Sequence, residues 1–427
     1  MRLSSKPRGQ RRQSHALTPG ALTGLVAILG CAPDESASAV ADAWCEADSG
    51  AVVAFTAADD AGLRAEEGLG SPRFVELWRA GGLNEGEELA FPLNASVSPD
   101  GRLAIADFGL SELAVVDADG GWHGRWARPG QGPGELARPV AAMWSEDGTS
   151  VAVFDIENAR IVFVEDGTSV RPDLALPVDV PSQVMASGSL AWAGATPDGH
   201  ALLQPSPTIV ADPTDPDLAP LRSAVLVAAP GSGAFDTLAA RTTPALGESR
   251  LGSLSAPGWP RLNVAAGASG ELAVGGEDAR YRVGTVGPDG KAGRVICREA
   301  PPLPVGERET EPPADARDPY TDSLAAVLAS APRPDSLAPF GRLFLSHEGH
   351  LWVQRDRPSA LRFGDAYHGV PGALYDVFDA EGRYLGEVRA PESARLQAAL
   401  GDTVWAYEVG ELDETWVVAY ELRWTAE

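Results

Sequence analysis

Two aspartates each follow an apolar run, and their carboxylates could bind a metal ion or accept hydrogen bonds. Asp107 follows residues 103–106, and Asp155 follows residues 151–154. Carboxylate oxygens are the ligands that Ca²⁺ prefers, and a bound metal ion can activate a water molecule or polarise a substrate. The same carboxylates can instead accept hydrogen bonds from backbone amides of strand-connecting loops. We favour hydrogen bonding and keep a Ca²⁺ or Zn²⁺ site at Asp107 and Asp155 as the alternative.

Three other patterns that suggest chemistry have simpler explanations. His347 and His350 belong to a tight turn, whereas the zinc-protease pattern needs two His residues four positions apart on a helix. The glycine-rich residues 130–134 lack the Lys-Ser/Thr ending of a phosphate loop. The chain contains no Gly-x-Ser-x-Gly elbow, and its six His residues leave few bases to activate a nucleophile. We therefore predict no catalytic residue, and binding is favoured over catalysis.

The elements that would position these residues are short strands joined by repeated Asp-Gly or Glu-Gly turns. One set of turns lies at residues 98–103, 145–148, 196–200, 268–272 and 346–351. A second set lies at residues 117–120, 165–167, 287–290 and 379–382. Two hairpins in most units give about four strands each, at the roughly 40–50-residue spacing of propeller blades. The sequence predicts an all-β fold, a six-bladed β-propeller of four-stranded antiparallel blades.

The predicted propeller occupies residues 70–427. Its six units cover residues 91–136, 139–176, 188–238, 261–298, 341–388 and 394–424. The apolar residues 74–78 lie outside these units, and we expect them to supply the strand that closes the ring. Closure removes the exposed sheet edges that invite aggregation.

Long connections are predicted to gather on one face of the propeller. In a four-stranded meander the first and third turns share a face, and the second turn shares the other with the link between blades. The second face therefore receives residues 204–222, residues 355–373 and an insertion at about 299–340 with a helix at 321–329. Because binding residues concentrate on loops, we predict a ligand site among the cationic and aromatic residues of one connection: Arg355, Arg357, Arg362, Tyr367 and His368.

Three motifs resemble bacterial six-bladed propeller lipoproteins related to the NHL-repeat and TolB-like propellers. Residues 155–161 resemble the NHL signature, with Asp155 ending one strand and Asn158 and Arg160 beginning the next. Residues 130–136 are similar to a Gly-x-Gly-Pro-Gly-Glu-Phe connection of these lipoproteins, with Leu136 in place of Phe. Residues 349–353 and 377–386 resemble their penultimate blade. The resemblance covers about residues 70–424 and implies the fold rather than an activity.

The first 30 residues predict an export signal. Five basic side chains precede an apolar stretch at residues 16–30 that is shorter than the roughly 20 residues of a membrane-spanning helix. Residues 28–31 resemble a lipobox, so we expect residues 1–30 to be cleaved, Cys31 to be lipidated and residues 31–69 to form a tether and N-terminal extension. An ordinary signal peptide with an incidental Cys31 is the alternative. The expected location is the bacterial envelope, facing the periplasm or the cell surface.

The cysteine count bears on a possible disulfide, and the net charge limits the classes of partner. Cys45 and Cys297 remain once Cys31 is lipidated, and an oxidising compartment permits a disulfide between them. Two buried free thiols are the alternative. The formal net charge of −26 repels nucleic acid and anionic headgroups.

Two functions fit this sequence. The first is a lipid-anchored binding or scaffold propeller that recognises an envelope protein, a peptide or a glycan, with the membrane reached only through the lipid on Cys31. The second is a metal-dependent, lactonase-like hydrolase or lyase with a cation in the central channel. We favour the first, which needs no cofactor.

Overall fold

The computed structural model describes the following residues: 52–56, 62–169, 173–175, 193–195, 201–203, 221–228, 235–243, 245–249, 252–255, 262–275, 280–287, 292–300, 336–337, 339–355 and 369–424. The strands at 52–56 and between 193 and 255 are described by their backbone alone. Within these ranges no helix combines the length and the apolar character that a membrane crossing requires. The predicted signal at 1–30, Cys31, Cys45 and the helix at 321–329 lie outside the described residues.

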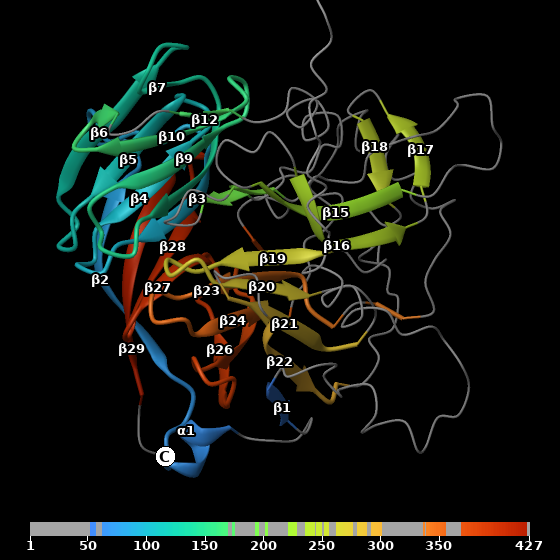
Figure 1. Cartoon of the computed structure of the whole chain (residues 1–427). Coiled ribbons are helices and arrows are strands. Elements are labelled where there is room, and N and C mark those ends of the chain that lie inside the picture. The colour runs from blue at the N-terminus through green and yellow to red at the C-terminus, as the bar shows by residue number, and fades with distance from the viewer. Residues whose placement is uncertain are drawn as a thin grey trace, which may run out of the picture.

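Five sheets of similar construction, which we call blades A to E, make up most of the described chain (Figure 1). Blade A contains β3 (Pro92–Val97), β4 (Leu103–Asp107), β5 (Glu112–Val116), β6 (Trp122–Pro129) and the short β7 (Glu135–Leu136). Blade B contains β8 (Pro139–Trp144), β9 (Val151–Asp155), β10 (Arg160–Glu165), β11 (Thr168–Ser169) and β12 (Leu174–Ala175). Blade C contains β19 (Asn263–Ala266), β20 (Leu272–Gly275), β21 (Arg282–Val286) and β22 (Ala292–Arg298). Blade D contains β23 (Arg342–Leu345), β24 (Leu351–Gln354), β25 (Leu374–Phe378) and β26 (Tyr384–Arg389). Blade E contains β27 (Arg395–Leu400), β28 (Thr403–Val409), β29 (Thr415–Arg423) and β2 (Arg73–Gly81).

The all-β propeller of four-stranded antiparallel blades is confirmed, but the count of six is corrected to five blades described with their side chains. The third predicted unit is represented by β13 (Ala193–Ala195), β14 (Ala201–Leu203), β15 (Leu221–Ala228) and β16 (Phe235–Thr243), which pair in this order as an antiparallel sheet of backbone. A separate hairpin, β17 (Ala245–Ser249) and β18 (Gly252–Ser255), follows it.

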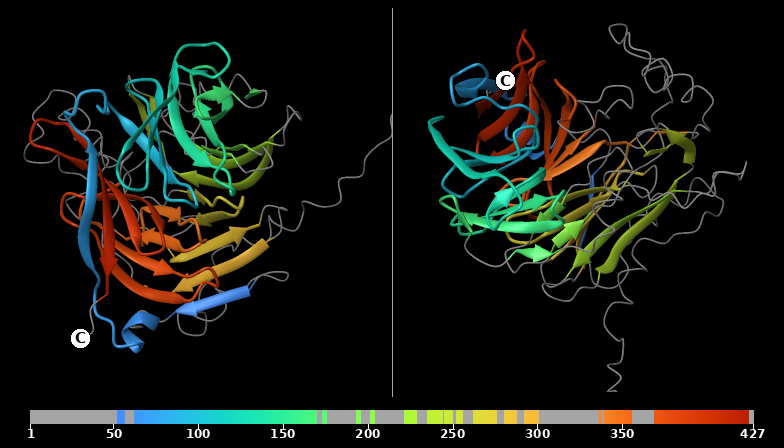
Figure 2. Two further views of the ribbon diagram at one scale, coloured as in Figure 1. Left: turned by 90° about the vertical axis from the view of Figure 1, so that its left-hand side faces the viewer. Right: turned by 90° about the horizontal axis from the view of Figure 1, so that it is seen from above.

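The blades follow one another around a centre, with their first strands innermost. β3 contacts β8 on one side and β27 on the other, and β23 lies between β19 and β27. The first and last blades are therefore neighbours, as the red and cyan sheets of Figure 2 show. β8 also contacts β13, so the β13–β16 sheet follows blade B in space as it does in sequence.

The core consists of layers between adjacent blades. One layer joins blades A and B, and others join C to D, D to E and E to A. Because a middle strand is covered on both of its faces, it reads as a continuous apolar run rather than an alternating one. All five residues of β4 are buried for this reason, including Asp107 at its end.

The ring is closed by the strand predicted from residues 74–78. β2 pairs antiparallel with β29, from Arg73 opposite Arg423 to Gly81 opposite Trp416, so the first strand of the propeller completes its last blade. Blade E thus joins both ends of the domain. This prediction is confirmed.

The N-terminal extension follows the outer edges of blades C, D and E. β1 (Val52–Thr56) adds a parallel strand to β22, the outermost strand of blade C. The short helix α1 (Leu63–Glu66) lies against β26 of blade D, and the Arg64 guanidinium lies 4.0 Å from the Trp424 ring centroid. The chain then enters β2. Residues 52–56, within the predicted tether and N-terminal extension, are therefore a strand at the edge of blade C.

The repeated turns have the predicted geometry. Gly101, Gly148, Gly270 and Gly349 occupy equivalent positions with φ between 68° and 88°. Each N–H donates to the carbonyl three residues earlier, at 2.9–3.0 Å. These turns join the first and second strands of blades A to D, and they define what we call the short-turn face. Because consecutive strands are antiparallel, the links between blades and the second-to-third connections lie opposite, on the long-connection face.

Gly148 shows how the turns of neighbouring blades fit together. Its φ is +68°, and a Cβ added there would come 2.8 Å from Cδ of Pro99 in blade A. Gly401 has a φ of +58°, but a Cβ there would meet nothing within 4 Å. Since the left-handed conformation alone costs about 1–2 kcal/mol, Gly401→Ala should lose that amount and Gly148→Ala clearly more. Urea unfolding of the two variants measures the difference, and equal losses would show that the turns do not touch.

Candidate functional site

Both carboxylate oxygens of Asp107 accept hydrogen bonds from backbone N–H groups. Its carboxylate accepts from the N–H groups of Ala90 (2.9 Å), Phe91 (3.0 Å), Gly109 (2.9 Å) and Leu110 (3.1 Å). The first two donors belong to the link that enters blade A, and the last two to the β4–β5 connection. The side chain is 0% exposed. Asp107 therefore fastens two loops of the long-connection face to the end of β4, and the predicted hydrogen-bonding role is confirmed.

Asp155 has the same position at the end of β9 in blade B. Its Oδ1 accepts from the N–H groups of Ala137 (3.1 Å) and Arg138 (3.0 Å), in the link that enters this blade. Its Oδ2 accepts from Asn158 Nδ2 (2.6 Å) and lies 3.5 Å from Arg160 Nε. The oxygens that a metal ion would need are thus engaged here as well. Among the residues that the structure describes, no three His, Cys, Asp or Glu side chains are grouped as a metal site.

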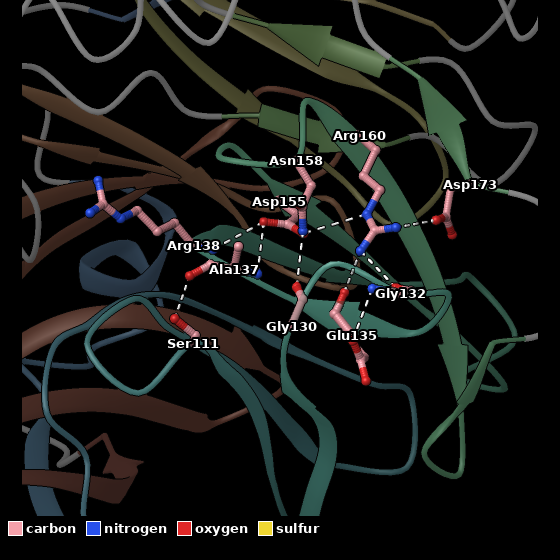
Figure 3. Close-up of polar contacts among 10 residues, drawn as sticks. All are labelled: Ser111, Gly130, Gly132, Glu135, Ala137, Arg138, Asp155, Asn158, Arg160 and Asp173. Carbon is pink, nitrogen blue, oxygen red and sulfur yellow. Dashed lines mark hydrogen bonds and ion pairs between the residues drawn. The ribbon is translucent and has the colours of Figure 1, made fainter.

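Asn158 and Arg160 fasten the glycine-rich link to the blade (Figure 3). Asn158 Nδ2 donates to the carbonyl of Gly130 (3.1 Å), and Arg160 Nη2 donates to the carbonyls of Gly132 (2.9 Å) and Glu135 (2.7 Å). Arg160 Nη1 also pairs with Asp173 (2.8 Å). The carbonyls of the link, which includes β7 of blade A, accept from side chains of blade B, so this network is a structural clamp between the two blades.

Substituting Arg160 tests the clamp. Arg160→Lys keeps the charge but cannot reproduce the planar fork that serves two carbonyls and Asp173 at once. We expect a loss of about 1–3 kcal/mol in the free energy of unfolding and faster amide exchange across residues 130–136. Arg128→Lys is the matched control, because the Arg128 side chain is 81% exposed and forms a surface ion pair with Glu135. If both variants behave alike, the clamp contributes nothing.

Blades D and E carry other polar residues near the end of the second strand, where blades A and B have Asp107 and Asp155. Gln354 ends β24 and accepts through Oε1 from Tyr375 Oη (3.2 Å) and the N–H of Val370 (3.4 Å). Glu408 of β28 accepts from Ser393 Oγ (2.9 Å) and from the Tyr420 hydroxyl. Both are buried. Neither was predicted from the sequence, although each comes after apolar residues of a second strand, as Asp107 and Asp155 do.

A buried ionic network lies between blades C and D, at the bases of two long connections. Asp376, in the middle of β25, is 0% exposed and accepts from the Arg298 guanidinium, from Tyr281 Oη (2.7 Å) and from Tyr384 Oη (3.1 Å). Arg298 ends β22, where the chain leaves blade C, and its guanidinium carbon lies 4.2 Å from the Tyr384 ring centroid. The network was not predicted, since residues 374–378 look like an ordinary strand.

Arg355, a predicted ligand residue, is part of this network. Its Nε lies 4.0 Å from Asp376 Oδ2, and its Nη1 pairs with Glu387. Asp376 thus contacts both Arg298, before residue 299, and Arg355, where the β24–β25 connection begins. Arg355 fixes the base of a loop in addition to any contact with a ligand. The other predicted ligand residues, Arg357, Arg362, Tyr367 and His368, lie outside the described residues.

Tyrosine ionisation reports on this network. Burial and then the charge of Asp376 raise the pKa of Tyr281 and of Tyr384 far above the ordinary value. Burial also raises the pKa of Tyr407 and of Tyr420. Because the folded state holds these protons more tightly, stability is unaffected below the unfolded pKa of about 10 and falls as the pH rises above it. We expect four tyrosines to ionise only on alkaline unfolding, so tyrosinate absorbance should rise together with the loss of circular dichroism.

Two further arginines lie at the long-connection end of the innermost strands. Arg342 begins β23, and its guanidinium donates to Gln397 Oε1 (3.0 Å) and the Leu396 carbonyl (3.3 Å). Arg395 begins β27 and donates to the carbonyl of Gly369 (3.2 Å). A Cβ at Gly369 would come 3.0 Å from both Arg342 Nη1 and Gln354 Oε1. Burial lowers the pKa of Arg342. Arg342 thus stands where one long connection ends, Arg355 stands where another begins, and Arg395 contacts the end of the second at Gly369.

Cys297 of β22 is disulfide-bonded, and its partner lies outside the described residues. It stands opposite Phe55 in the β1–β22 ladder, so the N-terminal extension passes beside it. The pairing with Cys45 stays a prediction. His347 and His350 lie in the short turn of blade D, where the N–H of His350 donates to Ser346 Oγ (3.1 Å).

These features define the protein as a β-propeller whose buried polar side chains hold the loops of one face. No protein-family model matches the chain, and no curated protein matches it. Its fold is similar to the solved structure of a DUF4221 family member from Bacteroides vulgatus (TM-score 0.50, 11% identity, 84% of this chain and 99% of that one). Some other solved structures have lower TM-scores. They include a Bacteroides fragilis protein described as a putative exported protein (TM-score 0.45, 11% identity, 88% of this chain and 100% of that one). They also include the PQQ-bound aldose sugar dehydrogenase of Streptomyces coelicolor (TM-score 0.42, 14% identity, 82% of this chain and 98% of that one). At these identities the likeness concerns the fold alone.

Proposed function

We propose that this protein is a six-bladed, lipid-anchored binding propeller of the bacterial envelope, related to the NHL and TolB-like propellers. In this proposal β13–β16 is the third blade, residues 1–30 are removed and Cys31 carries the lipid. The long-connection face recognises an envelope protein, a peptide or a glycan.

One observation carries the proposal. Arg342 and Arg355 lie at the ends of two long connections, and Arg395 of the adjacent blade donates to Gly369 at the end of one of them. The carboxylates that could serve catalysis, Asp107 and Asp155, are engaged by backbone and clamp donors instead. A rigid scaffold with its longest connections and several guanidiniums on one face suits recognition.

A binding experiment tests this face. The mature protein, purified from host envelopes with its partners, is compared with the double variant Arg357→Glu/Arg362→Glu. We expect the double variant to lose at least about tenfold in affinity, since each reversed charge opposes a contact that it formerly made. Arg383→Glu is the matched control, because the Arg383 side chain is 64% exposed and belongs to the short-turn face. Unchanged binding by the double variant would show that the ligand binds elsewhere.

The lipid anchor has its own test. Metabolic labelling with a fatty-acid analogue should label the wild type and not Cys31→Ala, and an unlabelled wild type contradicts the anchor.

The described residues give no observation that favours the alternative, a lactonase-like hydrolase or lyase. Elemental analysis of the mature protein should find no stoichiometric Ca²⁺ or Zn²⁺, and a bound metal together with a lower Tm on chelation would restore that alternative.

A further inference from the structure

Blade E carries an exposed apolar patch that the proposed function does not use. Four large apolar side chains of the described chain are exposed: Leu77 (48%), Leu83 (64%), Val409 (41%) and Leu412 (73%). All four belong to this blade or to its exit. Leu83, Val409 and Leu412 lie at its long-connection end, in two loops at residues 82–88 and 409–414. We call these two loops the blade E patch.

The two loops are fixed against each other. The N–H of Gly82 donates to the carbonyl of Thr415 (2.9 Å), and a Cβ at Gly82 would come 2.2 Å from the Trp416 ring. Glu87 accepts from Asn84 Nδ2 (2.9 Å), while Glu414 accepts from the N–H of Leu412 (2.9 Å) and from Trp416 Nε1 (3.2 Å). The leucines are therefore held outward by an ordered framework, so a partner need not order them on binding.

The patch is surrounded by negative charge. Its two loops contain six carboxylates and no basic residue: Glu85, Glu87, Glu88, Glu411, Asp413 and Glu414. None of the six takes part in the ion pairs found among the described residues. Arg79 of this blade pairs with Glu76 and Glu408. Arg125 of blade A donates to the carbonyls of Gly86 (3.4 Å) and Glu88 (2.9 Å), and its ion pair is with Glu112. Backbone N–H groups lower the pKa of Glu88 and of Glu414, so both are charged at neutral pH.

We infer that the blade E patch binds a cationic amphipathic segment of a partner protein. An apolar side chain of that segment packs between Leu83 and Leu412, and its lysines or arginines pair with the surrounding carboxylates. Burial of exposed leucine supplies affinity, while complementary charge supplies orientation and rate. Anionic lipid headgroups would meet like charge, so a membrane surface does not suit the patch. This site is separate from Arg357 and Arg362, and its test succeeds or fails independently of theirs.

A labelled peptide tests the inference with the mature protein. The probe is an amphipathic helix of Lys and Leu, compared with one in which each Leu is Ser and one in which each Lys is Glu. Fluorescence anisotropy should detect binding of the Lys/Leu peptide alone. Leu83→Ser/Leu412→Ser should weaken it at least about tenfold, and Glu411→Lys/Asp413→Lys should abolish it at low and at physiological salt. Leu77→Ser, an exposed leucine of the same blade outside the patch, is the matched control and should bind as the wild type does.

Other outcomes overturn the inference. Equal binding of the Lys/Leu and Lys/Ser peptides would show charge attraction without a role for the leucines. Unchanged binding by the Leu83→Ser/Leu412→Ser variant would place the peptide elsewhere, and no binding by the wild type would remove the site. Sedimentation with vesicles of anionic lipid, if retained by wild type and lost with the leucines, would show that the patch binds membranes.

Discussion

Replacing Asp376 by alanine is expected to lower the free energy of unfolding by about 3–5 kcal/mol, because removal of one member of a buried ion pair leaves the other charge uncompensated. The Arg298 side chain is 6% exposed and would keep its charge in the interior between blades C and D. Two tyrosine hydroxyls would lose their acceptor at the same time. Urea unfolding at neutral pH measures the loss.

A second substitution separates charge from shape. Asp376→Asn preserves the size of the side chain but removes the negative charge, so we expect most of the same loss. Glu381→Ala is the control, because Glu381 forms an exposed pair with Arg383 on the short-turn face and exposed pairs contribute about 0–1 kcal/mol. A small loss in Asp376→Asn would mean that packing, rather than the ion pair, holds the two blades together. Amide exchange at residues 299–300 and 369–373 should rise in the alanine variant if Asp376 also fixes the bases of the long connections.

Asp107→Ala is the other substitution with a large expected effect. It leaves four backbone N–H groups without their acceptor in a buried site, and each unsatisfied group costs about 1–3 kcal/mol before water enters. We expect the free energy of unfolding to fall by at least about 3 kcal/mol. The variant should then begin to unfold near ambient temperature. Thermal unfolding followed by circular dichroism provides the measurement.

Asp119→Ala, in the same blade, is the control for Asp107→Ala. Asp119 is exposed and accepts one N–H, from Gly121, at 3.0 Å, so Asp119→Ala should lose little. Asp107→Asn keeps one acceptor oxygen and should fall between the two. If Asp107→Ala is as stable as the wild type, the carboxylate is not structural, and its function as a metal ligand must be reconsidered. A Tm of the wild type that rises with added Ca²⁺ would point in that direction.

The fold could be predicted from the sequence because its signals are local. Each turn has Gly at a positive φ and Ser three positions before that Gly. This pattern recurs at residues 98–101, 145–148 and 346–349. The closing strand was found as an apolar run without a partner in any predicted unit. The parallel pairing of β1 with β22 could not be found, since it joins residues about 240 positions apart and leaves no local pattern.

The candidate site was predicted only in part. Asp107 and Asp155 follow apolar strands, so their hydrogen bonding to nearby loops could be deduced. Asp376 lies within a strand, and its partners Tyr281 and Arg298 come from another blade, so only the packing of the blades brings them together. Arg355 was predicted from its loop position, but its ion pair with Glu387 depends on the register of β25 and β26.

The route of the N-terminal extension has a mechanical consequence. A pull on the chain before Val52 reaches β22 by two routes: the disulfide of Cys297, since the other two cysteines of the chain both precede Val52, and the parallel β1–β22 ladder. The force would be absorbed at the outer edge of blade C before it reached β2, the strand on which ring closure depends. A protein held by its N-terminus could thus bear tension while the rest of the propeller keeps its shape.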